Sequence, residues 1–158
     1  MRRKTLRLIV TLAAMASVLV IAAPASATTT FVGLSVDESI PASTPGTILV
    51  SSIPGCSSGT VDTLDASASP FGSEGMQFRG TKVVNCDSGD TLTFTYVARY
   101  LSCDSPIDWG RWRISGGTGS LAGASGGGFL IGNYTGGSGT ACDSTGITDN
   151  WIGILRTP

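Results

Sequence analysis

The side chains in this chain that could carry chemistry are the carboxylates of its aspartates. Three of these aspartates directly follow a cysteine. The tripeptide Cys-Asp-Ser occurs three times, at Cys86-Asp87-Ser88, Cys103-Asp104-Ser105 and Cys142-Asp143-Ser144. Asp and Ser side chains bond to the backbone two residues on, so the simplest interpretation of each copy is a capped turn. A second hypothesis is a weak calcium site made by Asp104, Asp108 and Asp143, since hard cations take oxygen ligands.

Two other kinds of chemistry are disfavoured by the sequence. The chain has no histidine, so neither a Ser-His nor a Cys-His nucleophilic pair can form. Residues 117–122 match the formal pattern G-x-G-x-x-A, but a dinucleotide fingerprint must open a helix, and the glycines that follow oppose one. We therefore expect no cofactor, and interpret Gly116, Gly117 and Gly119 as a structural hairpin turn.

The N-terminus has the organisation of a secretory signal peptide. Four basic residues in the first seven positions precede an apolar run at 8–23, and Ala25-Ser26-Ala27 forms a small-x-small cleavage site. The run is shorter than the ~20 residues that a spanning helix needs. We expect cleavage after Ala27, export from the cell and no membrane attachment afterwards. Removing four of ten basic residues leaves six against eleven acidic ones, a net charge of −5, which disfavours nucleic-acid binding.

Alternating apolar and polar residues dominate the rest of the chain. In residues 91–100, Leu92, Phe94, Tyr96 and Ala98 share one face. Further strands are expected at 47–52, 60–68, 76–85, 111–115, 124–134 and 150–155. Residues 28–46 form an opening segment with a possible edge strand. Residues 47–158 are predicted to form an all-β domain, a single antiparallel up-and-down barrel of about eight strands, because closure removes free edges.

The order of strands in this meander predicts how the four cysteines pair. An even number in an exported protein indicates two disulfides. Successive antiparallel strands place alternate loops at the same end of a barrel. Cys56 precedes one strand and Cys86 ends the next, while Cys103 and Cys142 lie in loops that share the opposite end. We therefore predict Cys56–Cys86 and Cys103–Cys142 among the three possible pairings.

Six aromatic residues are candidates to line the barrel interior, either filling a core or surrounding a pocket for one apolar ligand. They are Phe78, Phe94, Tyr96, Trp112, Phe129 and Trp151. Lys82 has the same parity as the inward residues of its strand, but we expect a bulge at Gly80 to turn it outward.

The run GRWRISGGTGSLAGASGGGFLIG at 110–132 resembles a signature of bacterial secreted proteins, G-x-W-x-(I/V)-x-G-G-T-G-x-(aromatic)-A-G-x-x-G-x-G. That signature is similar to the barrel core of the allene oxide cyclase and dirigent-like superfamily. The segment FRGTKVVNCDSGDTLTFTY at 78–96 resembles the family's preceding hairpin. The resemblance implies an eight-stranded antiparallel barrel with an interior cavity. Leu121 replaces the usual aromatic residue, and no catalytic residue can be carried over by position.

Three functions remain open. The first is a secreted, non-enzymatic barrel that binds a small hydrophobic ligand. The second, implied by the resemblance, is a cyclase or isomerase of the allene oxide cyclase or dirigent type that acts in the barrel cavity. The third is a secreted interaction or inhibitor module. A deep apolar cavity would favour the first two, a buried polar group touching that cavity would favour the enzyme, and a solid core with an exposed aromatic patch would favour the third.

Overall fold

The computed structural model describes residues 27–158 of the chain. The predicted signal peptide lies almost entirely outside these residues, so its cleavage after Ala27 stays a prediction. Within residues 27–158, no helix has the length and apolar character needed to cross a bilayer.

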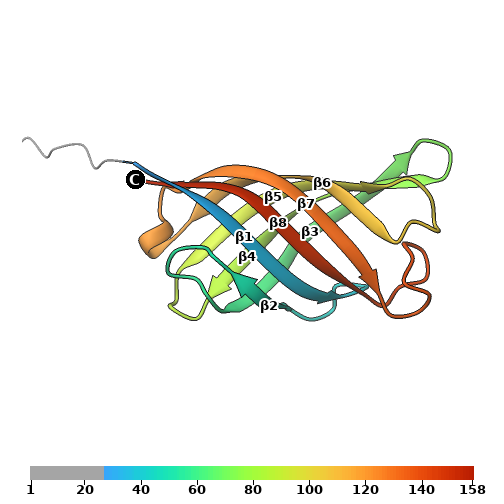
Figure 1. The fold of residues 1–158 in the computed structure, drawn as a ribbon, viewed down its shortest axis with the longest axis horizontal. Coiled ribbons are helices and arrows are strands. Elements are labelled where there is room, and N and C mark those ends of the chain that lie inside the picture. Colours follow the sequence, from blue (N-terminus) through green and yellow to red (C-terminus); the bar gives the residue numbers. More distant parts are fainter. Residues whose placement is uncertain (1–26) are drawn as a thin grey trace, which may run out of the picture.

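Eight antiparallel strands, each hydrogen-bonded to the next in chain order, close into a barrel (Figure 1). They are β1 (Thr28–Ser39), β2 (Gly46–Ser51), β3 (Gly59–Phe71), β4 (Gly75–Cys86), β5 (Thr91–Tyr100), β6 (Ile107–Gly117), β7 (Ser125–Thr135) and β8 (Gly146–Thr157). This arrangement confirms the predicted up-and-down barrel.

The opening segment belongs to the barrel. β1 pairs with β8 along its whole length, from Thr28 opposite Thr157 to Ser39 opposite Gly146, and it pairs with β2 on its other side. The expected edge strand at 28–46, ahead of a barrel at 47–158, is therefore corrected. The physical reason is the alternation of Val32, Leu34 and Val36, which are all buried and give β1 an inner face like that of the other strands.

The two disulfides lie at opposite ends of the barrel, as predicted. Cys56–Cys86 joins the loop at 52–58 to the end of β4, and Cys103–Cys142 joins the loops at 101–106 and 136–145. We refer to these as the Cys56 end and the Cys103 end. The β1–β2 loop at 40–45 also lies at the Cys103 end, because β1, β5 and β7 all run toward it.

A packed core fills the half of the barrel nearest the Cys56 end. The rings of Phe94, Trp112 and Trp151 lie with their centroids 5.3–6.2 Å apart, within the range of favourable aromatic pairs. The indole N–H of Trp112 donates to the carbonyl of Phe129 at 3.0 Å. Inward aliphatic side chains complete the core, among them Val36, Val84, Leu92 and Leu155.

The glycine-rich stretch forms a longer connection than a tight hairpin. β6 continues through Gly116 and Gly117, and a turn of 3-10 helix, η1 (Gly119–Leu121), precedes β7. Gly119 has a φ of 58°, which favours glycine. Leu121, only 1% exposed, packs into the core. Of the three predicted turn residues, only Gly119 lies in the turn. Gly116 and Gly117 belong to β6, where a β-carbon on Gly117 would clash with the Leu121 carbonyl oxygen.

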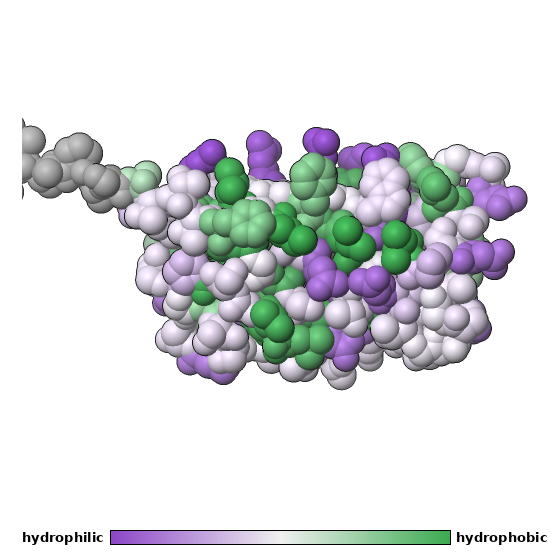
Figure 2. Space-filling view, viewed as in Figure 1, coloured by the Kyte–Doolittle hydropathy of each residue, from purple (hydrophilic) through white to green (hydrophobic). Residues whose placement is uncertain are grey.

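Apolar side chains also lie on the outside of the barrel. Figure 2 shows them gathered on the face formed by β1, β7 and β8, and Phe31, Phe129, Ile131 and Ile152 are among the exposed ones. Phe129 is 62% exposed, so its prediction as a cavity residue was wrong. In β7 the inward residues are Leu130 and Tyr134, which have the opposite parity to Phe129, and the preceding glycines conceal that parity in the sequence.

β3 and β4 extend beyond the rest of the barrel as a projecting hairpin (Figure 1). β2 pairs with β3 only at Gly46–Val61 and Thr47–Thr60, whereas β3 and β4 pair as far as Phe71 and Gly75. The middle of β3 therefore faces the 40–45 loop without a neighbouring strand on that side. Because β3 lacks a strand partner on that side, the 40–45 loop forms part of the wall around the barrel interior.

Candidate functional site

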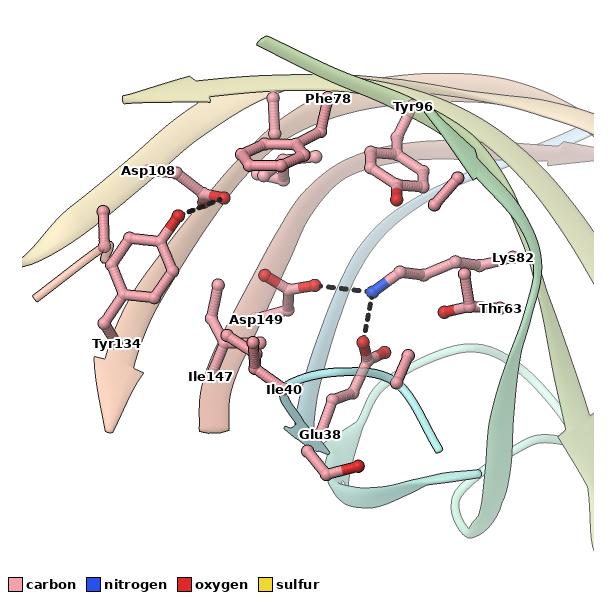
Figure 3. A pocket seen from close by; sticks show the side chains of 16 residues that line it. Glu38, Ile40, Thr63, Phe78, Lys82, Tyr96, Asp108, Tyr134, Ile147 and Asp149 are labelled. Atoms are coloured by element: carbon pink, nitrogen blue, oxygen red, sulfur yellow. Dashed lines mark hydrogen bonds and ion pairs between the residues drawn. The ribbon is translucent and has the colours of Figure 1, made fainter. Parts of the chain in front are cut away.

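A cavity of about 220 Å³ lies inside the barrel near the Cys103 end. Strand interiors and the 40–45 and 136–145 loops form its wall (Figure 3). The apolar lining comprises Ile40, Ala42, Ala66, Phe78, Ala98, Leu130, Ala141 and Ile147. The polar lining comprises Glu38, Ser39, Thr63, Lys82, Tyr96, Asp108, Tyr134 and Asp149. The interior is thus a packed core at one end and a mixed apolar and ionisable cavity at the other.

Lys82 points into this cavity and forms two ion pairs. Its Nζ donates to Glu38 Oε2 at 2.5 Å and to Asp149 Oδ2 at 2.8 Å, and Lys82 is only 4% exposed. The three side chains come from β4, β1 and β8, and Figure 3 shows them converging. Buried charges of this kind persist only when they are paired.

The inward direction of Lys82 corrects the expectation of an outward turn. β4 pairs with β5 from Met76–Tyr100 to Asn85–Thr91 without a register shift, so there is no bulge at Gly80 on that side. The irregularity lies in β3 instead, between Thr63 and Asp65. β4 therefore keeps its alternation, and carboxylates from other strands neutralise Lys82.

The ion pairs hold the charge on the lysine. Burial lowers the pKa of the Lys82 ammonium, but the charges of Asp149 and Glu38 outweigh this effect and raise the pKa above its ordinary value. Burial raises the pKa of Glu38, and Lys82 offsets part of that rise. Lys82 therefore remains an ammonium group at neutral pH.

Asp108 is the ionisable group most suited to exchange a proton near neutral pH. It is buried in the cavity wall, where Gly132 N–H donates to its Oδ1 at 3.1 Å and the Tyr134 hydroxyl donates to its Oδ2 at 3.4 Å. Burial, and then the charge of Asp149, raise the pKa of Asp108 to about 7. A carboxyl group with such a pKa can act as a general acid or base.

Gly132 allows two carboxyl groups to approach each other. Asp108, Gly132 and Asp149 are direct cross-strand neighbours on β6, β7 and β8. A β-carbon at position 132 would lie 2.5 Å from Asp108 Oδ1 and 2.7 Å from Asp149 Oδ1, closer than side chains can pack. The missing side chain therefore leaves the space that both carboxyl groups occupy.

The cavity contains more acidic groups than basic ones. Three carboxyl groups, those of Glu38, Asp108 and Asp149, face one ammonium group. Within residues 27–158, Glu38 Oε1 is buried without a hydrogen-bond partner. An unpaired buried carboxylate oxygen is costly. The cavity carboxyl groups are the acceptors that it offers to a ligand that donates a hydrogen bond.

The predicted interior aromatic residues fall into three groups. Phe78 and Tyr96 line the cavity. Phe94, Trp112 and Trp151 lie in the packed core, although Lys82 Nζ approaches the Trp151 ring to 5.4 Å from its centroid. Phe129 faces outward, as described above.

The calcium hypothesis is not supported by the described residues. Within 27–158, no group of three His, Cys, Asp or Glu side chains is placed to hold a metal ion. Asp108 faces the cavity, Asp104 lies on an exposed loop, and Asp143 Oδ2 accepts a hydrogen bond from Ser138 N–H at 3.1 Å. The three aspartates therefore do not converge, and Asp143 stabilises its own turn.

Sequence reasoning did not assign Glu38, Tyr134 or Asp149 to the interior. Parity was the available signal, because Glu38 follows Val32, Leu34 and Val36 at the same spacing. Asp149 similarly alternates between inward Ile147 and Trp151. A charged residue inside an apolar alternation is easily taken as the end of a strand, and the strand expected at 150–155 begins just after Asp149.

Comparison with known proteins assigns neither a family nor a function to the chain. No protein-family model matches the chain, and no curated protein matches it in sequence. Among solved structures, the chain is similar to the pterocarpan synthase dirigent protein GePTS1, with a TM-score of 0.37 and 15% sequence identity over 84% of this chain and 86% of that one. A similarity this weak transfers neither an activity nor a residue role, so function must be inferred from the cavity itself.

Proposed function

We propose that this protein is an exported β-barrel that binds one small, largely apolar molecule carrying a hydrogen-bond donor. The observation that carries this proposal is the interior cavity, in which apolar and aromatic side chains surround a small set of ionisable groups. Ligand sites commonly combine an apolar wall with a few polar groups that fix orientation. The two disulfides support export, because such bonds persist in oxidising compartments.

The cavity volume limits the size of the ligand. An apolar cavity of about 150 Å³ can hold a benzene molecule. The cavity of about 220 Å³ therefore suits a single ring with small substituents, or an aliphatic molecule of that size. The rings of Phe78 and Tyr96 and the side chain of Leu130 provide apolar contacts for such a molecule.

The ionisable groups define the polar end of the ligand. A hydroxyl or amine on the ring can donate to the Asp108 carboxylate in the cavity wall. A hydrogen bond to a charged group contributes about 1.5–3 kcal/mol. A phenol is therefore expected to bind at least about tenfold more tightly than toluene, which has nearly the same size but no donor.

A second candidate function is proton-transfer catalysis of the cyclase or isomerase type. The observation that favours it is Asp108, a cavity carboxyl group with a pKa of about 7. Its protonated form can donate to a ligand atom that gains electron density, and its ionised form can recover a proton from another atom. In this case Asp108→Asn would keep ligand binding and abolish turnover.

Native mass spectrometry of the exported protein tests for a co-purified small molecule. Titrations with phenol and toluene then compare wild type with Ala98→Leu, which fills the cavity from β5. The matched control is Thr95→Leu, which adds a similar side chain to the exposed outer face of the same strand. We expect Ala98→Leu alone to lose binding. Equal binding by both variants, or no binding by wild type, would refute the cavity as the ligand site.

A further inference from the structure

The outer faces of β4, β5 and β6 are strongly segregated in charge. Of the five arginines in residues 27–158, four lie on these adjacent strands with outward parity, at Arg79, Arg99, Arg111 and Arg113. The only acidic residue in the three strands is Asp108, which points into the cavity. The chain as a whole has eleven acidic residues and a net charge of −1, so this concentration of positive charge is local.

The strand register brings these arginines around one position. Val97 lies between Arg79 on one side and Arg111 on the other. Arg99 is two residues further along β5, opposite Trp109. Cross-strand neighbours are about 5 Å apart and diagonal ones about 7–8 Å. The four side chains, which we call the arginine face, therefore form one compact cationic surface.

Aromatic rings hold two of the guanidinium groups in place. The Arg99 guanidinium lies 4.1 Å from the Trp109 ring centroid and 4.9 Å from that of Phe71. The Arg111 guanidinium lies 5.3 Å from the Phe129 ring centroid. Stacking on a ring fixes the guanidinium plane. A ligand that binds its N–H groups therefore meets side chains that are already ordered.

A groove runs across the arginine face, and its cations are not neutralised by the protein. The groove has a volume of about 290 Å³ and is lined by Val97, Arg99, Trp109, Gly110, Arg111 and Phe129. Within residues 27–158, both ion pairs belong to Lys82, so none of these arginines contacts a carboxylate. Like charges at neighbouring strand positions are destabilising, and an anionic ligand would relieve that repulsion.

We propose that the arginine face binds the carboxylate groups of an acidic polysaccharide. Guanidinium groups bind carboxylates with two parallel hydrogen bonds. The exposed rings of Trp109 and Phe129 present electron-rich faces to the C–H groups of sugar rings. This site is separate from the interior cavity and does not depend on the cavity ligand.

The charge of the whole chain favours a glycan over a nucleic acid. Domains that bind nucleic acid usually carry an overall basic charge, whereas this chain is slightly acidic. The cationic surface also covers only three strands. An acidic polysaccharide, with one carboxylate on each sugar ring and apolar ring faces, fits both the small cluster of charges and the aromatic rings beside it.

Binding to polygalacturonate, neutral dextran and duplex DNA tests this proposal at two salt concentrations. We expect wild type to bind polygalacturonate, more weakly at higher salt, and not to bind dextran. Arg99→Gln with Arg111→Gln should weaken binding at least tenfold. Arg113 stacks on no aromatic ring of residues 27–158, so Arg113→Gln should weaken polygalacturonate binding severalfold without disturbing the stacked pairs. This single variant therefore shows that a loss in the double variant reflects lost charge and not a folding defect.

The matched control is Arg156→Gln, an exposed arginine on β8 outside the arginine face. It removes the same charge as Arg113→Gln and should change affinity less than twofold. The proposal is overturned if wild type binds no polygalacturonate, if Arg156→Gln loses as much affinity as Arg113→Gln, or if DNA binds more tightly than polygalacturonate.

Discussion

Replacing Asp108 with asparagine should make the protein more stable at neutral and alkaline pH. The folded-state pKa of Asp108 is about 7, whereas an aspartate in an unfolded chain has a pKa of about 3.9. Between these values the folded protein keeps a proton that the unfolded chain has released. The free energy of unfolding therefore falls as pH rises through this window. The difference between the two pKa values corresponds to about 4 kcal/mol.

Asparagine has nearly the same shape, can accept the Gly132 N–H hydrogen bond and does not ionise. Urea unfolding of wild type and Asp108→Asn at pH 4, 5.5, 7 and 8.5 measures the effect. The stability of the variant relative to wild type should rise by up to about 4 kcal/mol across this range. Asp104→Asn makes the same chemical change on an exposed loop and should differ from wild type by about 0.5 kcal/mol or less. A constant difference for Asp108→Asn, or one that falls with pH, would refute the burial argument.

Three further changes test the parts of the site separately. Lys82→Met leaves two buried carboxylates without their ammonium group and should cost about 3–5 kcal/mol in urea unfolding at pH 7; wild-type stability would show that the ion pairs do not form. Gly132→Ala places a methyl group against both cavity aspartates, and calorimetric titration with phenol should show binding lost, whereas unchanged affinity would contradict the geometry. Changing Cys103 and Cys142 to serine should remove about 4 kcal/mol by the loop-entropy model, measured as a lower urea midpoint, and an unchanged midpoint would contradict it.

The fold was largely accessible from the sequence because the strands alternate clearly. The spacing of Leu92, Phe94, Tyr96 and Ala98 defines an inner face on β5, and the same reasoning ordered the strands and paired the cysteines. Up-and-down topology leaves few choices, since each loop must lie at one end or the other. The disulfide Cys103–Cys142 could therefore be predicted without knowledge of any side-chain contact.

The site was less accessible because its groups come together only through barrel closure. Lys82 forms ion pairs with Glu38 and Asp149, which lie on strands that are distant in sequence. No local sequence pattern indicates which carboxylate will pair with a lysine. The bulge was expected in β4, whereas the structure places it in β3. Since one inserted residue reverses the facing of every residue beyond it, that choice decided the predicted direction of Lys82.

Binding of a small ring with a hydrogen-bond donor inside the barrel can be followed by methyl-resolved NMR during a phenol titration. Ile40, Leu130 and Ile147 all line the cavity and report on it. We expect saturable shifts at these methyl groups, none at exposed Ile152 on the outer face, and at least about tenfold weaker binding of toluene. Shifts that do not saturate, that appear equally at Ile152, or that toluene reproduces at the same concentration would contradict this expectation.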